Sequence, residues 1–282
     1  MAFAEAVPPL ESSSDHQQVE LDTENPKDVL KDSKKDVLEH PQEIFQAIGV
    51  IYGKVSLSKD SNNTITIGRY QYPLFYVPRK RRVFDALSKE IEATGNHTQR
   101  LLVYPGAIHF PQKEKPHQIS FHLVGFDKGQ EEELFSRELK DLEFKLSGLW
   151  QFIPVCPVPC ISIFRNFNHQ RLEYLKQFDP ATKVKYMKAN HLPVLWKDAP
   201  VKPFRFNPKA DKDQGHPMFV SIKAKFIPQR NVFGFDSLLS LPQETPPRFL
   251  RVSKKDKAAA QQSSAKDNSR QNPDDQNRLE KA

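Results

Sequence analysis

Alternating apolar and polar residues dominate the start of the central region of the chain. Residues 42–57 cluster apolar and β-branched side chains as a long strand does. The turn-forming residues of 58–63 follow, and then the strictly alternating run Thr64-Ile65-Thr66-Ile67. Residues 71–77 form a third run, in which Pro73 restricts the strand to an edge, a start or a bulge. Three consecutive strands are therefore predicted.

The period then changes from that of a strand to that of a helix. Apolar residues of 83–93 recur at helical spacing, and Thr94-Gly95-Asn96 supplies a stop signal. Residues 100–110 and 118–126 predict two further strands. The predicted order over residues 42–126 is three strands, one helix and two strands.

A similar pattern recurs almost a hundred residues later. Thr64–Arg69 matches Cys160–Arg165 at an offset of 96, with two isoleucines and the arginine in register. Three weaker matches follow the same order: residues 48–51 with 147–150, 101–104 with 193–196, and 119–126 with 219–226. Four matches in one order predict a duplicated β-rich module.

The element order resembles the oligonucleotide/oligosaccharide-binding (OB) fold, a five-stranded Greek-key barrel with its helix between strands three and four. The resemblance covers residues 42–126 and, more loosely, 144–227. It implies a mainly β protein with two tandem five-stranded OB-like barrels, each binding through strands two and three. The second copy departs from the pattern at residues 169–190, where Asp179-Pro180 interrupts any helix. Its third strand and its helix stay open.

The predicted organisation has five parts. An acidic arm covers residues 1–40, the first module 41–127, a connecting helix 128–143, the second module 144–252 and a polar tail 253–282. We expect the arm and the tail to be disordered, because both are polar with few aromatic residues. Residues 234–242 are interpreted either as a short closing helix packed on the second barrel or as an exposed docking turn.

Charge is distributed unevenly along the chain. The net charge is −6 over residues 1–40, +2 over residues 253–282 and +11 over the body between them. A basic body attracts polyanions such as nucleic acid. Basic bodies also occur in proteins that bind only other proteins, so charge alone leaves both classes open. The acidic arm either competes for the basic surface or is simply solvated.

Basic and aromatic residues are interleaved between Arg69 and Arg82, as single-strand binding requires. On the resemblance, Tyr70 or Tyr72 stacks on bases while neighbouring arginines hold phosphates, and residues 165–176 play the same part in the second copy. Two alternatives stay open, since barrel aromatics often fill the core and Arg79–Arg82 is equally a solvated turn or a nuclear-import signal. The predicted nucleic-acid-binding residues are Arg69, Tyr70, Tyr72, Tyr76, Arg79, Lys80, Arg81, Arg82, Arg165, Phe167, Arg171 and Tyr174.

Motifs for catalysis or for a bound cofactor are absent from the sequence. It contains no phosphate-binding loop, dinucleotide fingerprint, zinc-protease motif or nucleophile elbow. We therefore expect a non-enzymatic protein without a cofactor. Its two cysteines, Cys156 and Cys160, lack a nearby histidine pair, so a zinc site would miss half its ligands. Core packing is favoured for them, with a redox or metal role as the alternative.

The predicted function is single-stranded DNA or RNA binding in the cytosol. The amino terminus does not resemble a secretory signal, and no run approaches the roughly 18 apolar residues of a membrane helix. The alternative is a protein–protein interaction adaptor, with partners bound through the termini or Phe233–Leu241. An adaptor predicts that Tyr70, Tyr72 and Tyr76 are buried or meet an apolar patch.

Overall fold

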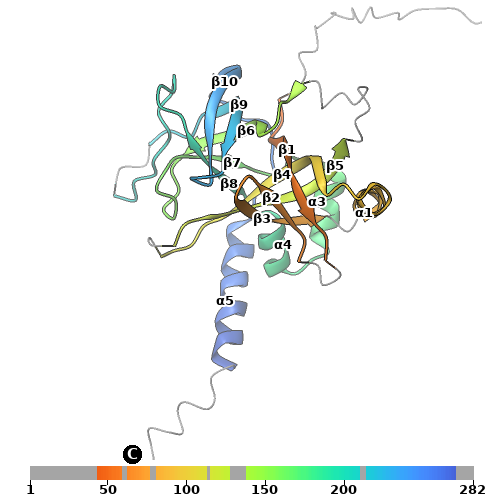
Figure 1. The fold of residues 1–282 in the computed structure, drawn as a ribbon. Helices are drawn as coiled ribbons and strands as arrows, with labels where there is room; N and C mark the ends of the chain where they lie inside the picture. Colours follow the sequence, from red (N-terminus) through yellow and green to blue (C-terminus); the bar gives the residue numbers. More distant parts are fainter. Residues whose placement is uncertain are drawn as a thin grey trace, which may run out of the picture. The chain divides into compact units, whose positions relative to one another are not determined.

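The computed structural model describes residues 43–58, 62–76, 81–112, 115–127, 138–209 and 214–270, with side chains up to residue 262. Most of the predicted connecting helix, the acidic arm and residues 271–282 lie outside these ranges. Within them the chain is mainly β (Figure 1). The elements are β1 Gln46–Ser56, β2 Thr64–Ile67, β3 Tyr70–Tyr76, α1 Arg81–Thr94, β4 Thr98–Ile108, β5 Gln118–Asp127, β6 Glu143–Gln151, β7 Cys160–Ile163, α3 His169–Lys176, α4 Pro180–Tyr186, β8 Asn190–Leu195, β9 Phe219–Ile227, β10 Val232–Gln243 and α5 Lys254–Arg270.

The first five strands form a closed barrel. Neighbouring strands pair in the order β1-β2-β3-β5-β4 and β4 returns to β1; only the β3–β5 pair is parallel. The predicted order of three strands, a helix and two strands is confirmed, with α1 between β3 and β4 and in contact with β5. This connectivity is compatible with an OB-like barrel.

The second group of strands repeats this set of pairings. β6 pairs with β7, β7 with β8, β8 with β10 in parallel, β10 with β9, and β9 with β6. An antiparallel pairing of β1 with β6 joins the two groups, so that all ten strands belong to one sheet. One continuous apolar core contains residues of both groups. Its aromatic centre comprises Tyr72, Phe121, Phe144, Phe226 and Phe233.

In two of the four sequence matches, the matched strands have different positions in the pairing order of the two groups. Residues 193–196 match β4 in sequence, but they end β8, which pairs as β3 does. Residues 219–226 match β5 in sequence, but they form β9, which pairs as β4 does. Inward and outward side chains alternate in the same way in every strand of a barrel. The sequence pattern therefore locates strands but does not show their order in the sheet.

The remaining strand, β10, covers the segment expected to be a closing helix or a docking turn. Phe233 is fully buried in the core, whereas Leu238, Leu239 and Leu241 are exposed. Regular pairing with β9 is interrupted by register shifts after Phe235 and Leu238. These bulges obscure the alternation on which a strand prediction depends.

Three helices belong to the second group and its extension. Asn168 and Asp179 are the N-cap residues of α3 and α4, and their side chains accept hydrogen bonds from the backbone N–H groups of Arg171 and Thr182, respectively. Asp179-Pro180 thus separates two helices, because proline fits the first turn of the second. α5 begins after Ser253, whose Oγ accepts from the Asp256 N–H at 3.0 Å. The tail predicted to be disordered from residue 253 therefore contains a helix.

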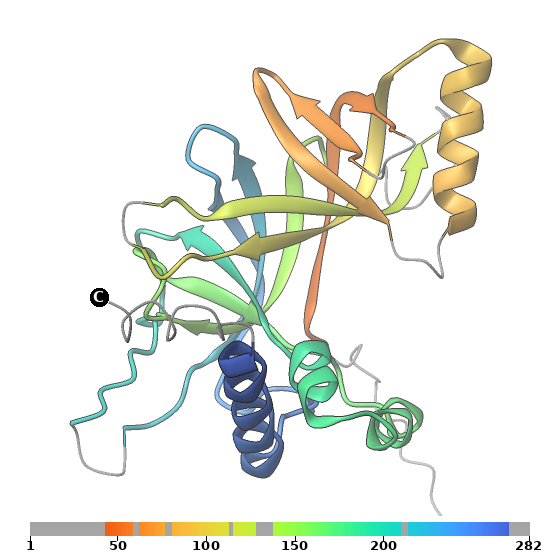
Figure 2. The same ribbon diagram turned by 90° about the horizontal axis from the view of Figure 1, so that it is seen from below.

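Figure 2 shows α5 beside α4, and residues of the two helices are in contact. Ala260 of α5 is buried, while most of the other described side chains of this helix are exposed or partly exposed. In the described part of the chain, no helix is both long enough and apolar enough to span a membrane.

Candidate nucleic-acid interface

Tyr72 was expected to stack on a base, but it is a core residue. Its side chain is 4% exposed, and its ring packs edge to face with the rings of Phe121 and Phe226 at centroid distances of 5.5 and 5.4 Å. Its hydroxyl lies 3.1 Å from both the Pro228 carbonyl oxygen and Asn231 Oδ1. Burial raises the pKa of Tyr72 to about 12. No ring face is left for a base.

The other two tyrosines predicted to bind nucleic acid, Tyr70 and Tyr76, are partly buried. Tyr76 stacks on Phe84 of α1 at a centroid distance of 4.4 Å. The Tyr70 hydroxyl accepts a hydrogen bond from Arg69 Nε at 3.0 Å, and both tyrosines pack against the core. Ring contacts inside the protein therefore replace much of the surface that a base would use.

The basic run that follows β3 is described only in part. Arg79 and Lys80 lie outside the described residues. Arg81 and Arg82 are exposed at the start of α1, and Arg81 Nε lies 3.8 Å from Asp85 Oδ2. An exposed ion pair at this distance contributes little free energy, so Arg81 stays accessible to an anion.

Sequence reasoning missed the outward-facing ring of β3, Phe75. Its side chain is 44% exposed and lies 5.4 Å from the ring of His122 on β5, which is itself opposite Tyr104 of β4. The signal was in the sequence: because side chains alternate along a strand, an inward Tyr72 and Leu74 place Phe75 outside. The first barrel thus offers rings on its outer surface but few described cations beside them.

A much stronger basic surface lies in the second half. Residues 164–188 and 247–257, here called the α3–α4 surface, contain eleven lysines and arginines against three aspartates and glutamates. The two segments are held together by backbone hydrogen bonds from the Phe167 N–H to the Arg248 carbonyl and from the Leu250 N–H to the Arg165 carbonyl. An apolar cluster centred on Leu175, Met187 and Leu250 supports the surface from beneath.

Three arginines of this surface lie over aromatic rings. The guanidinium carbons of Arg165, Arg248 and Arg251 are 4.2, 4.3 and 4.4 Å from the ring centroids of Tyr186, Phe167 and Phe249, respectively. All three arginines are exposed. Over the described ranges, no carboxylate forms an ion pair with any of them. A guanidinium held flat on a ring keeps N–H groups at its edge to donate to an oxyanion.

These contacts combine predicted residues with others that were missed. Arg165 and Phe167 were predicted, and Arg165 Nε also donates to the Tyr186 carbonyl oxygen. Arg248 and Arg251 were missed because residues 247–252 lie at the predicted end of the module. The available signal was again interleaving, in Arg248-Phe249-Leu250-Arg251.

The two remaining predicted residues have different surroundings. Arg171 Nη1 donates to the Asn166 carbonyl oxygen at 3.0 Å, which fixes its side chain close to the backbone. Tyr174 is 46% exposed and contacts Phe178 edge to face at 4.9 Å. Tyr174 therefore offers an accessible ring on α3.

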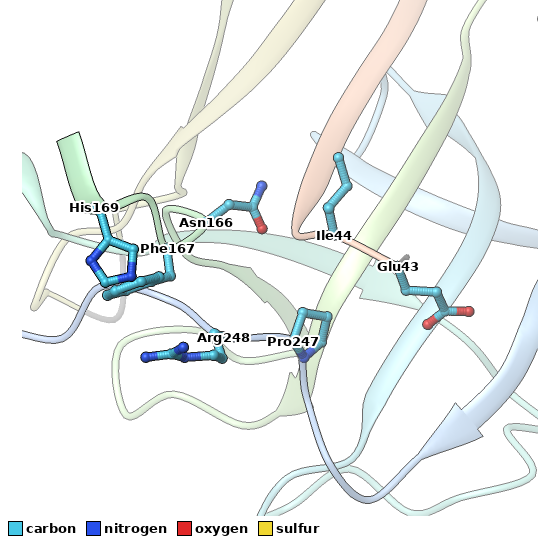
Figure 3. A pocket seen from close by; sticks show the side chains of 7 residues that line it. All are labelled: Glu43, Ile44, Asn166, Phe167, His169, Pro247 and Arg248. Carbon is cyan, nitrogen blue, oxygen red and sulfur yellow. The ribbon is translucent and has the colours of Figure 1, made fainter. Parts of the chain in front are cut away.

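A pocket of about 290 Å³ opens beside the α3–α4 surface. Figure 3 shows Phe167, His169 and Arg248 on one side of it and Ile44 and Glu43 across from them. Asn166 fixes the chain at this point, since its side chain bonds to both the N–H and the carbonyl of Phe45 at 2.8 Å. Glu43 Oε2 is buried and has no hydrogen-bond partner in the described part of the chain. The pocket thus combines an aromatic ring and a cation, whereas the Glu43 carboxylate points away from them (Figure 3).

Both cysteines are buried, as their favoured role in core packing requires. Cys156 lies in the turn before β7, and Cys160 is the first residue of that strand. One ring nitrogen of His109 and the two sulfur atoms lie within 4.8 Å of one another. Sequence spacing could not reveal this set, because His109 follows β4, far upstream of both cysteines.

No protein-family model, curated protein or solved structure matches this chain. What the α3–α4 surface binds therefore has to follow from the chemistry of its own residues.

Proposed function

We propose that this protein binds single-stranded nucleic acid, without enzymatic activity, through the α3–α4 surface. The observation that carries the proposal is the set of three exposed arginines whose guanidinium carbons lie 4.2, 4.3 and 4.4 Å from aromatic ring centroids. Phosphate oxygens accept paired hydrogen bonds from a guanidinium, and a fixed guanidinium loses less conformational entropy on binding. The large excess of basic residues draws the polyanion to this surface.

Single strands fit this surface better than a duplex does. A base can enter a pocket or stack on an exposed ring only when it is not paired in a helix. The pocket beside Phe167 and His169 is large enough for a flat ring. Tyr174 supplies a further exposed ring on α3.

We also infer that the two groups of strands are tandem OB-like modules. Both have the same order of pairings, with the third and fifth strands parallel. Strands two and three of an OB-fold form its usual binding face. In the second module these are β7 and β8, and the chain between them contains α3, α4 and Arg165.

The decisive experiment is fluorescence anisotropy with labelled single-stranded DNA and RNA of about 20 nucleotides, measured between 50 and 300 mM salt. The variant Arg248→Ala/Arg251→Ala should weaken binding and reduce the salt slope by about 0.7 for each phosphate that the protein no longer neutralises. The matched control is Arg81→Ala/Arg82→Ala, which removes the same charge from α1. Equal effects of both variants would show that binding depends only on the net charge of the protein, which would contradict the assignment to the α3–α4 surface.

A conservative variant separates charge from geometry. Arg248→Lys keeps the positive charge but removes the planar group that lies on Phe167. We expect it to bind more weakly than the parent protein and more tightly than Arg248→Ala. An affinity equal to that of the parent would show that the contact between the guanidinium and the Phe167 ring contributes nothing.

A protein–protein interaction adaptor is the second candidate function, and the carboxyl-terminal part of β10 favours it. Beyond Gly234 this strand has no pairing with β8, and Leu238, Leu239 and Leu241 are 39%, 46% and 80% exposed. Partners of the Phe233–Leu241 segment would meet these leucines, because Phe233 is buried. Failure to bind oligonucleotides at 50 mM salt, together with a protein partner that Leu239→Asp/Leu241→Asp no longer captures, would favour the adaptor.

A further inference from the structure

Two cysteines and a histidine from the two halves of the molecule meet at one buried place. His109 follows β4 of the first barrel, whereas Cys156 and Cys160 flank the start of β7. The exposed fractions of the cysteines are 6% and 0%, and both thiols are free of disulfides. The imidazole nitrogen and the two sulfur atoms lie within 4.8 Å of one another.

The imidazole of His109 is already oriented for a further ligand. Its Nε2 lies 2.7 Å from the carbonyl oxygen of His191 and donates to it, which leaves Nδ1 as the nitrogen with a free lone pair. Nδ1 is buried and has no nitrogen or oxygen partner within the described residues, and the side chain that interacts with the ring is that of Cys156. Metal-binding histidines commonly have one nitrogen bonded to a carbonyl in this way, because that bond fixes the tautomer and the ring plane.

The loop between the cysteines is also restrained. It reads Cys156-Pro157-Val158-Pro159-Cys160, and each proline fixes one backbone dihedral angle. The Pro159 carbonyl accepts from the Val194 N–H of β8 at 2.9 Å, and the Cys156 N–H donates to the Ile153 carbonyl at 3.2 Å. The two sulfur atoms are therefore presented by a backbone that has little freedom to separate them.

We propose that His109, Cys156 and Cys160 bind a zinc ion, with a fourth coordination position open to water or another ligand. Thiolate sulfur and imidazole nitrogen are the donors that zinc prefers, whereas calcium and magnesium require oxygen. Zn–S and Zn–N distances of about 2.3 and 2.0 Å place tetrahedral ligands roughly 3.5–3.8 Å apart. Atoms already within 4.8 Å of one another reach this spacing through small side-chain rotations.

Charge balance supports the same occupant. Two thiolates and one zinc ion are neutral together, so the ion offsets the cost of burying the two negative charges. Any proton still on a thiol leaves to solvent when the sulfur binds the ion.

A bound ion would add a further link between the two halves, besides the β1–β6 pairing. A bridge already exists close to His109, where Asn190 Oδ1 accepts from the Ala107 N–H at 3.1 Å and Asn190 Nδ2 donates to the Pro105 carbonyl at 2.8 Å. Zinc bound to the folded chain and not to the unfolded chain stabilises the folded state by mass action. This role is independent of the α3–α4 surface.

The test uses the full chain, reduced and stripped of metal. Titration with Co²⁺ should give the visible absorption of a tetrahedral thiolate site at one ion per chain, and Zn²⁺ should displace it. Cys156→Ser and Cys160→Ser should each abolish the thiolate absorption or bind at least tenfold more weakly, and His109→Gln should weaken binding. His97→Gln is the matched control, because His97 lies next to the opposite end of β4.

A second measurement covers variants that fold poorly. Zinc should raise the midpoint of thermal unfolding of the parent protein and of His97→Gln, but not that of Cys156→Ser/Cys160→Ser. Three results would overturn the proposal: no metal uptake by the reduced parent protein, unchanged uptake in the double cysteine variant, or a Cys156–Cys160 disulfide that forms in air while the reduced thiols ignore zinc.

Discussion

The two groups of strands share one order of pairing and differ in what connects their strands. In the first barrel, only Gly68 and Arg69 separate β2 from β3, and Gly68 has the positive φ of 60° that a tight turn requires. In the second group, residues 164–189 separate β7 from β8 and contain α3 and α4. The basic and aromatic residues of the α3–α4 surface lie mostly in this longer connection. A common strand framework therefore does not imply a common binding surface.

Aromatic residues show the same contrast. Tyr72 and Tyr174 both come from segments rich in aromatic and basic residues. Tyr72 lies on a strand whose alternation directs it into the core, whereas Tyr174 lies on the exposed side of a helix. Residue type alone could not distinguish them, because the surrounding element decides which side of the chain meets water.

The largest expected effect tests this contrast directly. Tyr72→Ala should lower the free energy of unfolding by about 3–5 kcal/mol, because it leaves a cavity among Phe121 and Phe226. Tyr174→Ala should change it by roughly 0.5 kcal/mol or less, since the side chain is 46% exposed. Urea denaturation followed by circular dichroism measures both values. Similar decreases would contradict the different roles assigned to the two tyrosines.

A milder variant at the same position separates the hydroxyl of Tyr72 from its ring. Tyr72→Phe keeps the packing but removes the donor shared by the Pro228 carbonyl oxygen and Asn231 Oδ1. A decrease of about 1 kcal/mol in the free energy of unfolding is expected, as for one buried hydrogen bond.

The next effect tests the equivalence of the two groups. Lys54 of β1 pairs with Thr66, and Leu149 of β6 pairs with Ser162. The glycines that precede them, Gly53 and Gly148, therefore occupy equivalent places in the pairing of the two groups. The sequence match instead aligns Gly148 with Gly49. A Cβ on Gly53 would lie 2.4 Å from the Thr66 carbonyl oxygen, and one on Gly148 would lie 2.5 Å from the Ser162 carbonyl oxygen. Each strand therefore needs glycine where it crosses its neighbour closely.

Gly53→Ala and Gly148→Ala should each destabilise the protein by about 1–3 kcal/mol, because a backbone carbonyl cannot move aside as a side chain can. Gly125→Ala is the control, since its added Cβ would meet only the Leu102 side chain at 3.8 Å. Thermal unfolding of the three variants gives the comparison. A tolerated alanine at only one of the two equivalent glycines would show that the groups differ in packing at this point.

The smallest effect concerns His122, on β5 of the first barrel. Burial lowers the pKa of His122 below its usual 6.5, because the charged ring is poorly solvated. The unfolded chain then binds a proton that the folded chain does not, so stability falls as the pH drops below about 6.5. The slope from one such group is at most about 1.4 kcal/mol per pH unit.

His122→Gln should therefore flatten the decline in unfolding free energy between pH 7.5 and 5.5, whereas the exposed His216→Gln should leave it nearly unchanged. Chemical denaturation at four or five pH values measures the difference. A decline as steep in His122→Gln as in the parent protein would show that other groups carry the pH dependence.

Local pattern predicted the first barrel well and the second group less well. Alternation, a turn signal and a clear change of period are all present between residues 46 and 127, and each depends on residues close in sequence. In the second group, the bulges of β10 and the long connections of the chain break these local signals. Two of the four predicted sequence matches accordingly align strands that have different positions in the pairing order.

The candidate sites show the limit of the sequence most clearly. Arg165 and Phe167 could be predicted from interleaved charge and aromatic residues, but Arg248, which lies over Phe167, comes from a segment about eighty residues further along the chain. Likewise, His109 joins Cys156 and Cys160 only because β4 ends close to the start of β7.

The sequence by itself determined the strands and helix of the first barrel, the basic character of the body and the kinds of side chain available for binding. It could do so because these properties depend on local backbone preference and composition. Only the tertiary structure decided that Tyr72 is inside, that Arg248 lies on Phe167 and that a histidine meets two cysteines. Those outcomes depend on strand pairing and on a shared core, which bring together residues that no local pattern connects.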